Sequence, residues 1–182
     1  IPSTTIGTTT DSPDTTAAGA SPPGANVTLG DVTGAGFGLD ITAGSVGDVG
    51  LAGLRTSPGG YLGAVNVVSA RNLGLGADVF AASFAQSSGA GAGATTVSAN
   101  VTTSVGPANF VTGSGGFSLA ANRTIASAAT ISVDGGTGPI DVNGSLRTSS
   151  LSPTAVRLSH ASTVDLGNVN DGAGTKMPGT LV

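Results

Sequence analysis

Short runs in which apolar and polar residues alternate recur along most of this chain. Three neighbouring examples are residues 140–142, 155–158 and 164–166. Each run places its apolar side chains on one face and its polar side chains on the other, which is typical of a strand buried on one side. Glycine, serine, asparagine and proline lie between the runs and favour turns. The pattern therefore predicts many short strands joined by tight turns.

The apolar positions return at nearly constant intervals. Leu-Arg-Thr-Ser occurs at 54–57 and again at 146–149, and an Ala-Val pair follows each copy, at 64–65 and at 155–156. A repeat of 22 to 24 residues is what one coil of a β-solenoid requires, because stacked coils return the same kind of residue to the same interior position. Four series recur at intervals of 21 to 25 residues: Leu29, Leu51 and Leu73; Ile41 and Val65; Phe110, Ile131 and Val156; and Phe117, Ile140 and Val164.

Two all-β folds fit this pattern. A right-handed parallel β-solenoid explains the repeat directly, and we favour it. An antiparallel β-sandwich or jelly roll also contains alternating strands at regular spacing, and shared composition would then account for the repeat. In either case residues 26–182 are expected to form a single all-β domain.

Residues 77–94 interrupt the repeat. Phe80 and Phe84 are one helical turn apart, which fits a short helix, but they also share a face of a strand. We favour a strand, followed by a loop at residues 87–94 with the sequence SSGAGAGA.

The later coils carry a family resemblance. ISVDGGTGPIDVNGSLRTSS (131–150) and AVRLSHASTVDLGNV (155–169) resemble the coils of filamentous-haemagglutinin-type adhesins and autotransporter passengers, which are secreted right-handed parallel β-helices. The resemblance covers residues 27–76 and 110–170 and rests on periodicity and composition. It implies an extracellular, adhesive or structural role.

Residues 1–25 are rich in threonine, serine and proline and contain little to bury. They predict an extended or flexible N-terminal arm. If the arm is ordered by docking, it adds as a strand to the sheet of a neighbouring subunit. The residues expected to make that contact are Ser3, Thr4, Thr5, Ile6, Thr8 and Thr10.

Composition narrows the partners. The chain has 31 glycines, no glutamate and one lysine, a set that favours strands and turns over helices. Its formal net charge of −4 makes nucleic acid and anionic membranes poor partners. No run of about twenty apolar residues is present, so we expect no membrane insertion. Because the chain begins at Ile1, we expect a processed product that is secreted or displayed at the cell surface.

The sequence shows no catalytic constellation, and we expect no enzymatic activity. His160 is the only histidine, and no Gly-x-Ser-x-Gly motif presents a nucleophile. Asp141 and Asp165 would stack on adjacent coils, and paired carboxylates can cleave glycosidic bonds. A solvated column of aspartates is the simpler interpretation, because no tryptophan and a single tyrosine, Tyr61, leave no platform for stacking sugars.

We expect no cofactor, with calcium as the one candidate. Residues 74–80 and 135–141 approach the Gly-Gly-x-Gly-x-Asp calcium repeat, but neither has a tandem neighbour. The candidate calcium ligands are Asp78, Asp134 and Asp141. Four asparagines head glycosylation sequons: Asn26, Asn100, Asn122 and Asn143.

The leading functional hypothesis is a non-enzymatic extracellular structural or adhesive protein. It would be a self-assembling subunit of a fibre, pilus-like structure or surface layer, or a segment of an adhesin. Its partners would be copies of itself and host-surface or matrix glycans. The alternative is a β-helix module that binds or cleaves polysaccharide.

Overall fold

The computed structural model describes residues 4–5, 10–21, 23–34, 36–54, 60–89 and 91–169. These residues form sixteen strands and no helix. The strands are β1 (Thr4–Thr5), β2 (Val27–Thr33), β3 (Leu39–Thr42), β4 (Val49–Leu54), β5 (Leu62–Ser69), β6 (Leu73–Leu75), β7 (Val79–Gln86), β8 (Ala94–Val97), β9 (Val101–Thr103), β10 (Ala108–Val111), β11 (Gly116–Leu119), β12 (Thr124–Ser127), β13 (Ile131–Asp134), β14 (Ile140–Thr148), β15 (Val156–Ser159) and β16 (Val164–Val169).

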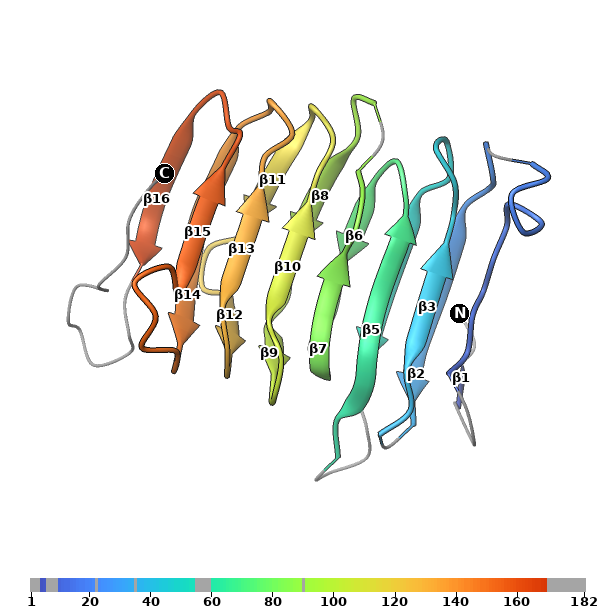
Figure 1. The fold of residues 1–182 in the computed structure, drawn as a ribbon, viewed down its shortest axis with the longest axis horizontal. Coiled ribbons are helices and arrows are strands. Elements are labelled where there is room, and N and C mark those ends of the chain that lie inside the picture. Colours follow the sequence, from blue (N-terminus) through green and yellow to red (C-terminus); the bar gives the residue numbers. More distant parts are fainter. Residues whose placement is uncertain are drawn as a thin grey trace.

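Every pairing among these strands is parallel. Parallel neighbours that belong to successive passes of the chain make a β-solenoid, in which each coil lies on the one before it (Figure 1). This confirms the solenoid. The antiparallel sandwich is wrong, because its neighbouring strands would run in opposite directions.

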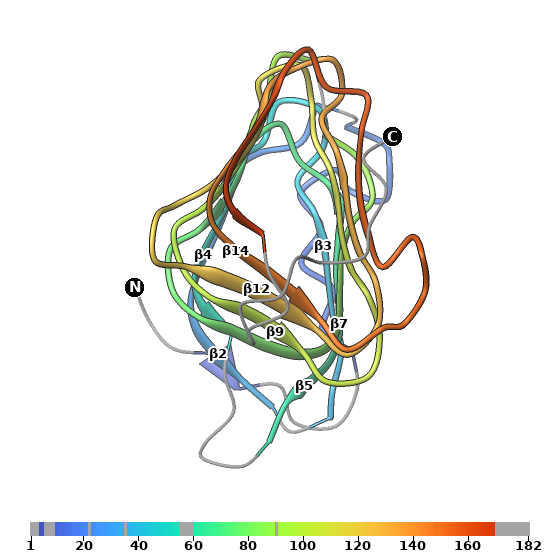
Figure 2. The ribbon, with the colours of Figure 1, turned by 90° about the vertical axis from the view of Figure 1, so that its left-hand side faces the viewer.

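The coils enclose one core and present three faces, seen end-on in Figure 2. The first face holds β6, β8, β11 and the starts of β2, β4, β14 and β16. The second face holds β9, β12, the start of β7 and the ends of β2, β4, β14 and β16. The third face holds β3, β5, the end of β7, β10, β13 and β15.

The register of the first face gives the length of each coil. Equivalent residues are Val27, Val49, Leu73, Thr95, Phe117, Ile140 and Val164, so the spacings are 22, 24, 22, 22, 23 and 24 residues. The predicted series Phe117, Ile140 and Val164 is therefore confirmed. Three other series contain errors of two residues: Leu51 stacks on Leu75 rather than Leu73, Ile41 on Val67 rather than Val65, and Phe110 on Val133 rather than Ile131. An error of two keeps the side chain on the same face of its strand, so inward and outward positions stay correct.

The sequence repeat corresponds to real structural equivalence. Leu54 and Leu146 occupy the same column of the second face, linked through Val79, Val101 and Ile125. Val65 and Val156 share a column of the third face. Leu54 and Leu146, which begin the two Leu-Arg-Thr-Ser copies, therefore lie four coils apart in one column; residues 55–57 lie outside the described residues.

The interior of the described coils is mostly apolar, and Gln86 and Thr95 are its two most deeply buried polar side chains. Phe84, Phe110 and Phe117 form a chain of tilted ring contacts with centroids 5.2 Å apart at each step. One coil earlier, the Oγ1 of Thr95 donates a hydrogen bond of 2.8 Å to the Oε1 of Gln86 across the core. Both side chains are buried, and the Nε2 of Gln86 has no hydrogen-bond partner among the described residues.

The expected strand in residues 77–86 is confirmed as β7, and a loop follows it. Phe80 and Phe84 do not share a face, however. β7 bends from the second face to the third, so the period-two alternation breaks at residues 82–83. Phe84 points into the core and Phe80 lies partly exposed outside it.

The described part of residues 1–25 lies along the first coil. β1 pairs with β2 of its own chain, and Asp11 and Asp14 bridge to Leu39 and Thr42. Thr10 is exposed, whereas Ser3, Ile6 and Thr8 lie outside the described residues. Docking of this arm onto a neighbouring subunit stays a prediction.

Candidate functional site

Asparagine and aspartate side chains form ladders at the corners of the coils. In the first ladder, each side-chain Oδ1 accepts a hydrogen bond of 2.9 to 3.3 Å from a backbone N–H of the next coil. Asn26 accepts from Asp48, Asp48 accepts from Asn72, and Asn72 accepts from Ala94. A second ladder runs from Asp78 through Asn100 to Thr124, with both steps 3.0 Å. Each side chain satisfies a backbone donor of the next coil where the turn interrupts the strand ladder. These residues hold the corners together.

The three candidate calcium ligands lie apart from one another. Asp78 belongs to the second ladder, and Asp141 accepts a 2.8 Å hydrogen bond from the Nδ2 of Asn143. Asp134 is paired with His160. Within the described ranges, no three acidic, histidine or cysteine side chains are grouped to hold a metal ion. Calcium at any one of these aspartates stays a prediction.

His160 lies on the surface at the end of β15, as expected for a loop histidine. Its Nδ1 is 2.7 Å from the Oδ2 of Asp134, so it pairs with Asp134 and not with Asp165. Burial raises the pKa of Asp134, but hydrogen bonds from His160 and from the N–H of Gly136 outweigh this and leave its pKa below the ordinary value. The pair joins the last two corners of the third face.

Asp141 and Asp165 are in register on adjacent coils, as their spacing predicted. They continue an outward column of the first face that begins at Thr28 and passes through Gly50, Gly74, Thr96 and Ser118. The column therefore changes from small and uncharged residues to acidic residues toward the last coil.

The four sequon asparagines differ in how far their side chains are engaged. Asn26 and Asn100 act in the ladders, and Asn100 both donates through Nδ2 and accepts through Oδ1. Asn143 is exposed and donates to Asp141. Asn122 is exposed at a turn with φ of 60°. Glycan attachment at any of the four stays a prediction.

A shallow hollow of about 290 Å³ lies on the first face, and its lining is almost wholly apolar. Its floor is the backbone of β4 and β6, and exposed threonine and serine side chains from β2 and from residues 96–98 rise at its two sides. The lining residues are Thr28, Gly50, Leu51, Ala52, Gly74, Leu75, Gly76, Thr96 and Ser98.

The glycines of this hollow are not required by the fold. A Cβ at Gly50 or Gly74 would meet nothing closer than 3.8 Å, and one at Gly76 would make an ordinary contact of 3.5 Å. None of the three has positive φ. By contrast, a Cβ at Gly47 or Gly144 would lie 2.2 or 2.3 Å from a backbone oxygen. Glycine weakens a strand interior, so its use at Gly50 in β4 and Gly74 in β6, where nothing forces it, calls for a reason outside the folded monomer.

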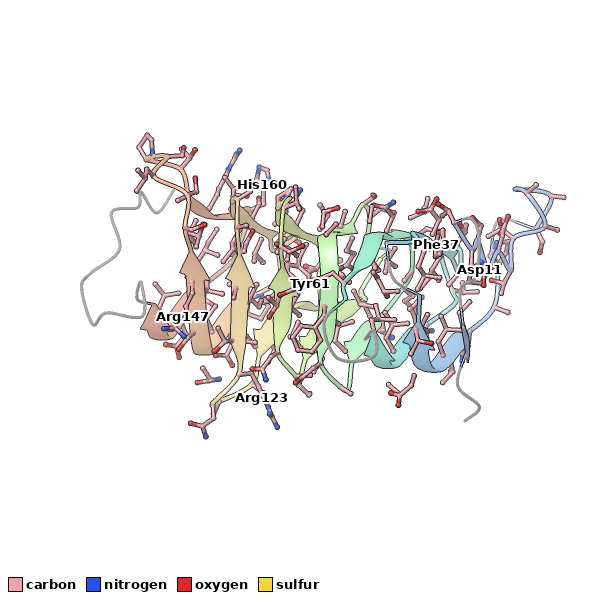
Figure 3. The ribbon with its side chains drawn as sticks, turned by 90° about the horizontal axis from the view of Figure 1, so that it is seen from below. Asp11, Phe37, Tyr61, Arg123, Arg147 and His160 are labelled. Carbon is pink, nitrogen blue, oxygen red and sulfur yellow. The ribbon has the colours of Figure 1, made fainter. Side chains whose placement is uncertain are left out.

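The second face carries an aromatic pair, Tyr61 with Phe80, and the side chain of Arg147, while Arg123 lies at the corner just before β12. Tyr61, Arg123 and Arg147 are labelled in Figure 3. Tyr61 is 39% exposed and meets Phe80 edge to face, with ring centroids 6.1 Å apart. Arg123 and Arg147 are exposed, and neither forms an ion pair with any described residue. The sequence alone does not indicate this pair, because only the fold brings Phe80 beside Tyr61.

Comparison with known proteins adds no relative. No family model, no curated protein and no solved structure matches this chain. In the part of the chain that the structure describes, no helix is long and apolar enough to cross a membrane.

Proposed function

We propose that this chain is a non-enzymatic structural or adhesive protein, secreted or displayed at the cell surface, that assembles with copies of itself into a fibre or layer. The observation that carries the proposal is the first face. Its outward column is small and uncharged over five successive coils, from Thr28 to Ser118. Flat β surfaces of this kind pack closely against other β surfaces.

Two further features support assembly. Charged residues that would guard a β surface against association are scarce, since the whole chain has six lysines and arginines. Large apolar side chains are also exposed outside the core, including Val105 at 76% and Leu151 at 98%. The extracellular location rests on the resemblance of residues 131–150 and 155–169 to secreted adhesins.

The proposal is tested on the unmodified protein by size-exclusion chromatography with light scattering, and by electron microscopy of negatively stained samples. We expect a concentration-dependent rise in mass and particles that are longer or wider than one solenoid. A monomer at every accessible concentration would overturn the self-assembly proposal.

A second candidate, polysaccharide cleavage or binding, is favoured by one observation. Asp141 and Asp165 are in register on adjacent strands, so their Cα atoms lie about 5 Å apart, and retaining glycosidases hold two carboxyls about 5 Å apart. If this pair is catalytic, Asp141→Asn and Asp165→Asn should each abolish the release of reducing ends from a polysaccharide panel. Asp40→Asn, on the third face, is the matched control. Absence of turnover by the unmodified protein would remove the cleavage candidate.

A further inference from the structure

We propose that copies of this chain pack side by side with parallel axes, the second face of one copy lying on the first face of the next. This inference rests on the proposed function, because it names the contact through which the subunits assemble. Its occupant is a second copy of this chain, and two independent features of the surface meet in the same alignment.

The first feature is a match of shape. Tyr61, which is exposed, and Phe80, which is partly exposed, form an aromatic pair on the second face, and the hollow on the first face is an apolar recess floored by Gly50 and Gly74. Aromatic side chains that enter apolar recesses are the usual anchors of protein interfaces. The unforced glycines then have a purpose, since any side chain at Gly50 or Gly74 would fill the recess.

The second feature is a match of charge. Arg147 lies on the second face, and Arg123 lies at the corner just before β12; neither has an acidic partner among the described residues. Asp141 and Asp165 lie on the first face near the same end of the solenoid. Opposite charges on facing surfaces align two partners and disfavour other arrangements.

The two matches require the same axial alignment. On the second face, the column from Phe80 to Arg147 passes through Thr102 and Ala126, which is three coil steps. On the first face, the column from Gly74 to Asp141 passes through Thr96 and Ser118, which is also three steps. Each step is about 4.8 Å, so both distances are about 14 Å. When two parallel copies lie with equivalent coils at the same height, Phe80 is opposite Gly74 and, at the same time, Arg147 is opposite Asp141. Antiparallel copies cannot make both contacts at once.

The interface uses two different patches, one on each copy. An open assembly therefore has a free first face at one end and a free second face at the other. It can go on adding subunits until it closes into a ring. The aromatic contact supplies most of the affinity, because exposed ion pairs contribute little. The charges fix the alignment and make assembly sensitive to salt.

Charge exchange tests the alignment. One variant combines Arg123→Asp and Arg147→Asp, and the other combines Asp141→Arg and Asp165→Arg. Each variant alone places like charges at the contact, so we expect assembly to need at least about tenfold more protein than the unmodified chain. An equal mixture restores opposite charges at every contact and should assemble near the original concentration. Arg157→Asp, on the third face, is the control and should assemble normally.

Recovery in the mixture cannot arise from misfolded variants, so it supports the inference directly. If the unmodified chain assembles and the two variants assemble equally well alone, this interface is wrong while the proposed function stands. Loss of assembly in both variants without recovery in the mixture would also overturn it. If the unmodified chain is monomeric, the proposed function fails first.

Filling the recess gives a second, independent test. Gly74→Thr has room in the monomer and replaces glycine with a strand-forming residue, so its melting temperature should equal or exceed that of the unmodified chain. Its assembly should nevertheless need at least about tenfold more protein. Ala85→Thr adds the same side chain to the outside of β7 on the third face and should leave assembly unchanged. Normal assembly of the stable Gly74→Thr variant would refute the recess as the docking site.

Discussion

Single polar side chains hold the corners of this solenoid. Asn100 connects its own coil to both neighbouring coils, because its Nδ2 donates to Asp78 and its Oδ1 accepts from the N–H of Thr124. Asn100→Ala removes both hydrogen bonds and leaves the partly buried backbone N–H of Thr124 without its acceptor. We expect a loss of about 1–2 kcal/mol in the free energy of unfolding, measured by urea denaturation. Asn143→Ala removes only an exposed bond to Asp141 and should change that free energy by less than about 0.5 kcal/mol. Equal effects for the two would contradict the role of the ladder.

A second prediction at this scale concerns pH. The hydrogen bond from Arg71 holds the pKa of Asp48 below its ordinary value of 3.8. A carboxyl group whose pKa is lowered by folding stabilises the fold at pH values above its ordinary pKa. This contribution is lost as the pH falls through the folded-state pKa. Asp48→Asn keeps an oxygen that can accept from the N–H of Asn72 but lacks the charge. At about pH 7 the melting temperature of the variant should therefore be lower than that of the unmodified chain. The difference between the two melting temperatures should narrow below about pH 4. A constant gap from pH 7 to pH 2.5 would show that the ion pair with Arg71 does not stabilise the fold.

At the scale of the strand, the most informative contact is the polar pair inside the core. Gln86 at the end of β7 and Thr95 in β8 face each other between apolar layers. Thr95→Val leaves the Oε1 of Gln86 buried without a donor, so we expect a loss of about 1–3 kcal/mol in the free energy of unfolding. Gln86→Met combined with Thr95→Val removes both polar groups and should recover most of that loss. The test is urea denaturation of the single and double variants, and a double variant weaker than Thr95→Val alone would contradict it.

The strands themselves were largely predictable, and the reason is physical. Alternation marks which side of a strand is buried, and a stacked coil must return a similar side chain to each interior position. This was enough to align Phe117, Ile140 and Val164, and to equate Leu54 with Leu146. Alternation does not distinguish a column from its neighbour two residues away, which is why Phe110 was matched with Ile131 instead of Val133.

The surfaces were harder to predict, because they depend on which coils become neighbours. Phe80 lies outside the core because β7 bends at a corner between two faces. No glycine or proline in the sequence of β7 indicates this bend. The recess had a signal, because Gly50 and Gly74 occupy the outward position of the runs Val-Gly-Leu and Leu-Gly-Leu. Only the structure shows that a side chain at Gly50 or Gly74 would have room, and this separates them from Gly47 and Gly144, which the backbone requires.

The whole molecule is a stack in which each coil contacts only its neighbours, so its length can be changed without altering its faces. Gly116 stacks on Ala94, so residues 94–115 make one complete coil in register. A variant with a second copy of residues 94–115, carrying Thr95→Val in the inserted copy, should fold into a solenoid one coil longer. The substitution is needed because the inserted threonine would have no partner such as Gln86 in the core.

This longer variant tests whether assembly depends on the distance between the recess and the acidic column. The insertion adds one coil, about 4.8 Å, between Gly74 and Asp141 and the same distance between Phe80 and Arg147. Its own copies still match each other, so it should assemble alone. Against the unmodified chain the aromatic and charged contacts cannot both align, so two fluorescently labelled populations should sort into separate particles, with little energy transfer between them. Random mixing of the two populations would show that assembly does not depend on the distance between the recess and the acidic column. The proposed side-by-side alignment would then be wrong.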